Sequence, residues 1–165
     1  MTDDDIDAVA VVHVRTWQAA YAGIVPADHL AAMDVAAMAE RRRTMPVPPG
    51  VRTLVATDDG QVVGFVVFGP YRGEDGTEPE RGQLYAIYVT PGHWGRGAGR
   101  LLFDAAKAGL TAAGFPDMRL WVLAENHRAR RFYERVGMAP DGARDHYIPA
   151  GTQVELPELR YAMAL

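Results

Sequence analysis

The run LYAIYVTPGHWGRGAGRLLF, residues 84–103, passes from a strand pattern to a helix pattern across one short turn. The turn holds Gly95, Gly97 and Gly99. Glycine adopts backbone angles that other residues avoid and lets a ligand approach the main chain closely. The free amides at the start of a helix also attract phosphate. Two interpretations follow: a tight strand-to-helix turn, or a site for a pyrophosphate group, with Arg96 and Arg100 as added cationic donors.

Two known nucleotide-binding patterns do not fit this turn. Gly-x-Gly-x-x-Gly fails in both registers, because Arg100 and Leu102 stand where the third glycine is required. The P-loop pattern fails because no Gly-Lys-Ser/Thr is present. A nucleotide-binding protein of another class is therefore a disfavoured alternative.

Hydrophobic periodicity predicts the remaining elements. We expect helices over 3–21, from Pro26 to about 42, over 97–113 and over 126–136. We expect strands over 52–57, 61–68, 83–90, 118–124, 138–148 and 155–164, with a hairpin turn at 58–60 and a surface loop over 70–82.

This order predicts an α+β fold in which helices flank one mixed, mostly antiparallel sheet, within a single domain spanning 1–165. Mixed folds of this shape usually begin with a strand, yet this chain begins in a helix pattern. Either the true start lies upstream, or the sheet does without an edge strand.

Composition excludes several classes of protein. The formal net charge is −4 with 17 basic and 21 acidic residues, which disfavours a nucleic-acid partner. The chain has no cysteine, so it has neither disulfides nor a cysteine nucleophile, and nothing in it suggests a metal site. No apolar run is long enough to span a membrane, and the acidic start is unlike a signal peptide. We expect a soluble, cytoplasmic protein.

Two separate motifs resemble the GNAT superfamily of N-acetyltransferases. The stretch PGHWGRGAGRLL (91–102) is similar to the family's acetyl-CoA pyrophosphate loop, Gln/Arg-x-x-Gly-x-Gly/Ala after a strand. The stretch LAENHRARRFYERVGM (123–138) resembles the family's later strand, Asn, helix, Phe-Tyr and closing Gly. The opening Trp17…Tyr21…Pro26 is similar to bacterial members. One departure is Trp94, which stands where the family prefers Gln or Arg.

The resemblance implies how acetyl-CoA would bind as co-substrate. The amides of Gly95, Arg96, Gly97, Ala98, Gly99 and Arg100 would take the pyrophosphate. Ile87, Tyr88 and Val89 would pair with the pantetheine like an added strand, and an amide near Val89 would face the thioester carbonyl. Asn126 would cap the following helix and contact the pantetheine.

The same resemblance makes Tyr133 the general acid that protonates the leaving thiolate, with a packed core tyrosine as the alternative. The acceptor would be a primary amine, on a small molecule or on a peptide or protein, and acetyl would pass to it directly in a ternary complex. A catalytically silent acyl-CoA-binding module is the rival interpretation.

No general base can be assigned from the sequence. Gln83 and Trp121 occupy the two positions where some members carry Glu. The candidates left open are His13, Glu80, Glu125, His146 and a chain of waters. His13 lies on the apolar stripe of the first helix with Trp17 and Tyr21, so it is either a core residue or, with them, part of the acceptor pocket.

Charged surface residues leave further alternatives. Glu74, Asp75, Glu78 and Glu80 form either a solvated loop or a rim that attracts a cationic amine. The arginines at 128, 130, 131 and 135 form a solvated helix face from which some could reach the ribose phosphate of the cofactor. An unpaired sheet edge allows a homodimer.

Overall fold

The computed structural model describes residues 1–73 and 76–165, and the side chains of all of these except 76–79. The helices are α1 (Ile6–Ala20), α2 (Ala27–Ala31), α3 (Val35–Thr44), α4 (Ala98–Ala112) and α5 (His127–Arg135), with short 3-10 turns η1 (Asp3–Asp5) and η2 (Pro91–His93). The strands are β1 (Arg52–Asp58), β2 (Gln61–Gly73), β3 (Gly76–Val89), β4 (Asp117–Leu123), β5 (Ala139–Tyr147) and β6 (Leu156–Ala164).

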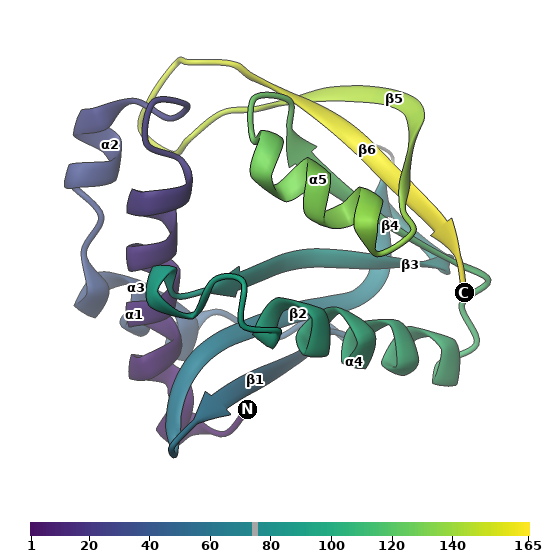
Figure 1. Ribbon diagram of the computed structural model, residues 1–165, viewed down its shortest axis with the longest axis horizontal. Helices are drawn as coiled ribbons and strands as arrows, with labels where there is room; N and C mark the ends of the chain where they lie inside the picture. Colours follow the sequence, from purple (N-terminus) through teal and green to yellow (C-terminus); the bar gives the residue numbers. More distant parts are fainter. Residues whose placement is uncertain (74–75) are drawn as a thin grey trace.

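The strands form one sheet in the order β1-β2-β3-β4-β6-β5, and only the β3–β4 pair is parallel. Helices flank this sheet (Figure 1). The predicted α+β fold with a mixed, mostly antiparallel sheet is therefore confirmed. Within the described residues no strand precedes α1, and β1 forms one edge of the sheet.

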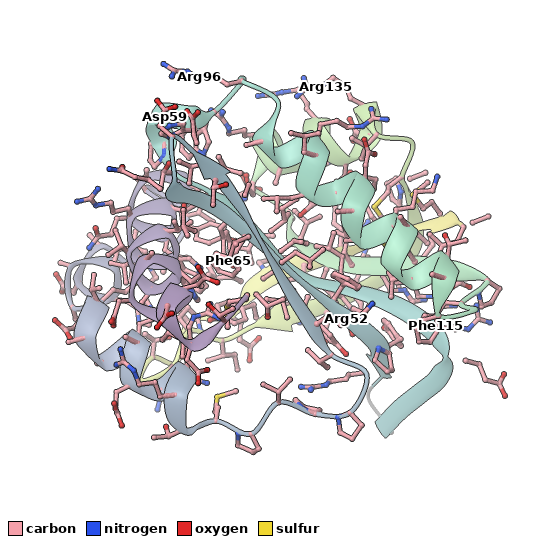
Figure 2. All side chains as sticks on the ribbon, turned by 90° about the horizontal axis from the view of Figure 1, so that it is seen from below. Arg52, Asp59, Phe65, Arg96, Phe115 and Arg135 are labelled. Atoms are coloured by element: carbon pink, nitrogen blue, oxygen red, sulfur yellow. The ribbon has the colours of Figure 1, made fainter. Side chains whose placement is uncertain are left out.

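The two faces of the β1–β3 half are buried under different helices. Side chains alternate along β2, so Phe65 packs with Val9 and Val12 of α1, while Val66 packs with the apolar side of α4, including Phe103. Figure 2 shows α1 and α4 on opposite sides of this half of the sheet, with Phe65 between them. This sandwich fixes β3, the strand that leads into the glycine turn.

The parallel pair β3–β4 separates soon after it begins. The two strands are in register only at Gly82 with Met118 and at Gln83 with Arg119. Beyond Gln83, the described strands offer β3 no partner on this side. The main chain on that edge up to Val89 therefore has no strand partner in the described residues, although the Val89 carbonyl already accepts hydrogen bonds from side chains.

A β-bulge at Tyr85 shapes the same strand. Val67 pairs with Ala86 and Phe68 pairs with Leu84, so Tyr85 is the extra residue. The bulge shifts the alternation by one residue, so that Leu84 and Val89, which regular alternation would place on opposite faces, both reach the core under α4. Bulges commonly adjust strands next to functional sites.

The single helix predicted from Pro26 to about residue 42 is wrong. The structure has two helices, α2 and α3, separated at Ala32–Asp34. Asp34 begins the second of them, because its Oδ1 accepts a hydrogen bond of 2.8 Å from the Ala37 amide. A local N-cap therefore interrupts a continuous helical pattern.

The predicted surface loop over 70–82 is also wrong. Strand pairing continues to Gly73 on β2 and resumes at Gly76 on β3, with Tyr71 opposite Glu78 and Gly73 opposite Gly76. Tyr71 is buried. Ladder hydrogen bonds and this burial outweigh the poor strand propensity of glycine and proline.

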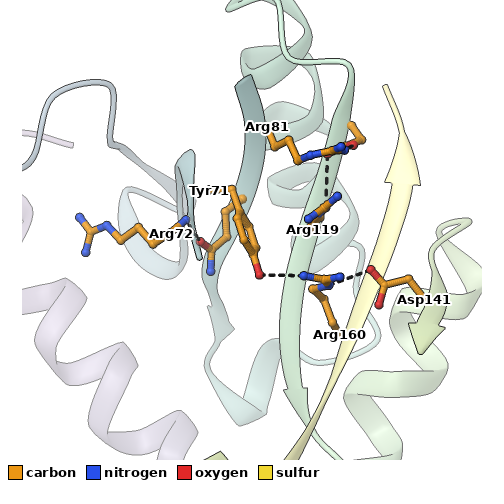
Figure 3. Close-up of polar contacts among 8 residues, drawn as sticks. Tyr71, Arg72, Arg81, Arg119, Asp141 and Arg160 are labelled. Atoms are coloured by element: carbon orange, nitrogen blue, oxygen red, sulfur yellow. Dashed lines mark hydrogen bonds and ion pairs between the residues drawn. The ribbon is translucent and has the colours of Figure 1, made fainter. Parts of the chain in front are cut away.

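A polar network lies across the sheet on the side where β3 and β4 are paired (Figure 3). Arg160 of β6 donates to the Tyr71 hydroxyl at 3.1 Å and to the Asp141 carboxylate of β5 at 2.8 Å. Nearby, the buried Gln83 accepts a hydrogen bond of 2.9 Å from the Arg72 amide. These contacts join β2, β3, β5 and β6, so they stabilise the sheet at the end where β3 and β4 are paired.

None of the helices in the described part of the chain combines the length and apolar character needed to cross a membrane. Across the same residues, no three His, Cys, Asp or Glu side chains gather as a metal ion would require.

Candidate active site

The glycine turn has the backbone geometry that glycine permits. Gly95 and Gly97 have positive φ angles of 77° and 96°, and Gly97 is the N-cap residue of α4. Apart from the adjacent residues in the chain, no described atom lies within 4 Å of the position that a Cβ would occupy at either residue. Gly99 instead lies in the first turn of α4, against the Phe132 ring. The backbone angles alone therefore explain two of the three glycines, and the space beside them is open.

The amides of this turn lack backbone acceptors within the described chain. The first hydrogen bond of α4 runs from the Leu101 amide to the Gly97 carbonyl, at 3.0 Å. The amides of Ala98, Gly99 and Arg100 therefore have no acceptor inside the helix. The helix dipole adds partial positive charge at the same point. This geometry suits an anion.

The turn opens onto a cavity of about 790 Å³. The cavity lies between the separated ends of β3 and β4 and extends under the end of α1. Of the predicted site residues, those that line it are Trp17, Tyr21, Ile87, Tyr88, Val89, Gly95, Gly97, Gly99, Arg100, Asn126 and Tyr133. Residues of α1, of the continuous segment from β3 through the glycine turn to α4, and of α5 thus share one cavity.

Trp94, at the position where the sequence departs from the family pattern, points back into the fold. Its indole Nε1 donates a hydrogen bond of 2.6 Å to the Val89 carbonyl, which also accepts one of 3.1 Å from the Thr16 hydroxyl. The guanidinium of Arg128, on α5, lies over the Trp94 ring. Arg128 and Arg100 both line the cavity beside the glycine turn. A second cation is therefore held near the turn by Trp94.

Tyr133 is 7% exposed and lies on α5. Burial raises the pKa of its hydroxyl above the usual value, and the neighbouring Tyr88 raises it further. The hydroxyl is therefore protonated at neutral pH and able to donate a proton. Asn126 caps α5, since its Oδ1 accepts a hydrogen bond of 3.1 Å from the Ala129 amide. The cap orients the helix that carries Tyr133.

His13 does not line the cavity, in contrast to Trp17 and Tyr21. Its ring lies 5.1 Å from that of Tyr88 and 5.6 Å from that of Trp17, and its Nδ1 is 3.1 Å from the Arg42 guanidinium. Burial, followed by the charges of Arg42 and Arg41, lowers the pKa of His13 to about 4. Because arginine only donates, Nδ1 is the acceptor. His13 is thus a neutral packing residue behind the cavity wall.

Several other candidates lie away from the cavity. Glu80, Glu125 and His146 are exposed and do not line it. Arg96 is exposed and points outward from the rim (Figure 2), and the Ala98 side chain is not in the lining. Glu74, Asp75 and the side chain of Glu78 lie outside the described residues, so the predicted acidic rim has only Glu80 as a described member.

Sequence reasoning missed Glu158, which lines the cavity from β6. It pairs with Leu123 of β4 on one side and with Asp145 of β5 on the other. Because side chains alternate along a strand, Glu158 lies on the same face as Arg160, and the sequence alone would suggest that both side chains face solvent. No signal in the sequence distinguished it, because the residues that enclose it come from other elements.

A sheet that opens between two parallel strands, with a helix N-terminus at the opening, forms a site suited to an anionic ligand. Comparison with known proteins identifies the family. A sequence model of the acetyltransferase (GNAT) family matches residues 15–138, and the chain belongs to that family. It is an N-acetyltransferase by family and fold.

Individual proteins agree with this assignment. The chain is 36% identical over 124 residues to the uncharacterized N-acetyltransferase YuaI of Bacillus subtilis, covering 74% of this chain and 69% of that protein. It is 32% identical over 149 residues to the uncharacterized N-acetyltransferase Mb2688 of Mycobacterium bovis, covering 88% and 90%. The PaiA N-acetyltransferase of Thermoplasma acidophilum, solved with coenzyme A, has the same fold, with a TM-score of 0.72, 15% identity and coverage of 100% and 96%.

Proposed function

We propose that the protein transfers an acetyl group from acetyl-CoA directly to a primary amine, with both substrates bound at once. The observation that carries this proposal is the row of open amides at the glycine turn, which faces the same cavity as Tyr133. The family membership supports acetyl-CoA as the donor.

The residues of the site fit acetyl-CoA. The amides of residues 95–100 would hold its pyrophosphate, with Arg100 and Arg128 as cationic partners. Beyond Gln83 the free edge of β3 would pair with the pantetheine arm through Ile87–Val89, as an added strand. Asn126, which lines the cavity at the start of α5, would contact the same arm.

The chain's own groups would then act on the reaction in two ways. A main-chain amide near Val89 would donate to the thioester oxygen as negative charge develops there, and such donors typically lower a barrier by about 3 kcal/mol. Tyr133 would give its proton to the departing sulfur. Trp17 and Tyr21 would form the wall on the acceptor's side.

Thiol release on mixing the protein with acetyl-CoA and a panel of amines tests this function. We expect turnover by the wild type and a kcat about 100-fold lower in Tyr133→Phe, with little change in the affinity for coenzyme A. Calorimetry with coenzyme A measures that affinity. Binding without turnover over a broad panel would instead identify a silent acyl-CoA-binding module, and no binding at all would refute both.

A further inference from the structure

Basic and acidic side chains line different parts of the cavity. The arginines that line it, Arg100, Arg128 and Arg135, lie on α4 and α5. Glu158 is the one acidic residue among the described residues of the lining, and it lies on β6. A polyanionic ligand would therefore occupy the end beside α4 and α5, and the end beside β6 is suited to a cation.

Aromatic rings surround the end that holds Glu158. The Trp17 ring lies 4.8 Å from that of Tyr21 and 6.0 Å from that of Tyr147, and all three line the cavity. Burial raises the pKa values of Tyr21, Tyr88 and Tyr147, and the charge of Glu158 acts in the same direction on all three. Electron-rich rings beside a carboxylate are a recognised environment for ammonium groups.

Glu158 itself is partly buried, and among the described residues no cationic side chain pairs with it. Burial raises the pKa of its carboxyl to about 7, and the charge of Asp145 acts in the same direction. The group therefore exchanges its proton near neutral pH, which suits a base. The titratable groups that face it are Asp145 and Tyr147 on β5, Tyr21 after α1 and Tyr88 on β3.

We propose that Glu158 binds the ammonium group of a cationic primary amine and takes one of its protons, with Trp17, Tyr21 and Tyr147 enclosing the amine. This inference rests on the proposed acetyl transfer in the same cavity. It assigns both the missing general base and a class of acceptor, the alkylammonium ions, which must lose a proton before the nitrogen can attack.

The protons balance in two stages. Glu158 first takes a proton from the ammonium, which leaves a neutral amine. The nitrogen lone pair then forms a bond to the thioester carbon, giving an adduct with positive nitrogen and negative oxygen. When the carbon–sulfur bond breaks, Tyr133 gives its proton to sulfur and regains one from the adduct nitrogen. The products are an amide, a thiol and a protonated Glu158.

The other candidates for the base lack this placement. The Nδ1 of His13 is engaged with Arg42, and His13 is absent from the lining. Gln83 lines the cavity, but its side-chain oxygen accepts from the Arg72 amide and an amide is not a base.

The test compares Glu158→Gln with Glu155→Gln, an exposed glutamate three residues earlier that does not line the cavity. Both are assayed by thiol release from pH 5 to 9 with two sets of amines. One set is linear alkylamines and diamines, which are cationic at neutral pH. The other is trifluoroethylamine and similar weakly basic amines, which are largely neutral there. Calorimetry with coenzyme A and a melting temperature show that each variant is folded.

We expect Glu158→Gln to lower kcat/KM for the cationic amines by about 100-fold or more, with a much smaller loss for the neutral ones. The wild-type kcat/KM for the cationic amines should rise with pH around 7, and this rise should be absent in Glu158→Gln. Coenzyme A binding and the Glu155→Gln variant should match the wild type. An unchanged rate and pH profile in Glu158→Gln, or an equal loss with both sets, would overturn the inference while leaving the transferase intact. Wild-type protein that turns over neither set would overturn the proposed function itself.

Discussion

The guanidinium carbon of Arg128 lies 3.8 Å from the centroid of the Trp94 ring. The ring is itself fixed by the hydrogen bond from its indole nitrogen to the Val89 carbonyl. Tryptophan here cannot offer a phosphate the charge that Arg would supply at this position of the family pattern. The stacked Arg128 places a guanidinium from α5 beside the turn, since Arg–tryptophan stacking holds a guanidinium in place while leaving its edge able to donate.

Arg128→Ala should therefore weaken coenzyme A binding. A hydrogen bond to a charged group contributes about 1.5–3 kcal/mol, so we expect the Kd to rise about 10-fold or more. Calorimetry measures the change, which should shrink at high salt. Arg131→Ala is the matched control, because Arg131 is an exposed arginine on the same helix that does not line the cavity. Equal effects of the two changes would refute a specific role for Arg128.

Gly97→Ala should impair both folding stability and coenzyme A binding. At a φ of 96° a side chain is strained, at a cost of about 1–2 kcal/mol. If the turn relaxes to relieve the strain, the amides of the first turn of α4 move and the anion site is lost.

Gly142→Ala separates these two effects. Gly142 on β5 has nearly the same φ, 95°, and no atom near its missing Cβ, but it does not line the cavity. Both variants should therefore melt at lower temperature, and only Gly97→Ala should bind coenzyme A more weakly. Normal binding by Gly97→Ala would show that the turn serves chain geometry alone.

His13 should make the protein less stable in mild acid. Its pKa is about 4 in the folded protein and near the ordinary 6.5 when unfolded. Between these values the unfolded chain binds more protons, so the free energy of unfolding falls as the pH falls from 6.5 towards 4. In His13→Gln this part of the pH dependence should be absent.

Urea unfolding of both proteins at pH 7 and pH 5 measures this difference. The comparison is between slopes with pH, because the substitution also removes ring contacts with Trp17 and Tyr88 and lowers stability at every pH. Parallel pH dependence in the two proteins would show that His13 has the same pKa in the folded and unfolded states, and would refute this prediction.

The strand before the turn, the start of α4 and the cap of α5 could all be predicted because they depend on nearby residues. Positive φ at Gly95 and Gly97 and the Asn126 cap are properties of a few consecutive positions. The strands predicted over 138–148 and 155–164 likewise match β5 and β6 to within a residue at each end. The sequence by itself therefore determined the open amides and the helix that presents Tyr133.

The tertiary structure decided the rest. Trp94 reaches Val89 and Arg128, His13 is enclosed by Trp17, Tyr88 and Arg42, and Glu158 faces the cavity only because β3 and β4 separate opposite it. Each of these environments combines residues from distant segments. A side chain's charge state depends on which groups surround it and how far water is excluded, and no local pattern along the chain encodes that.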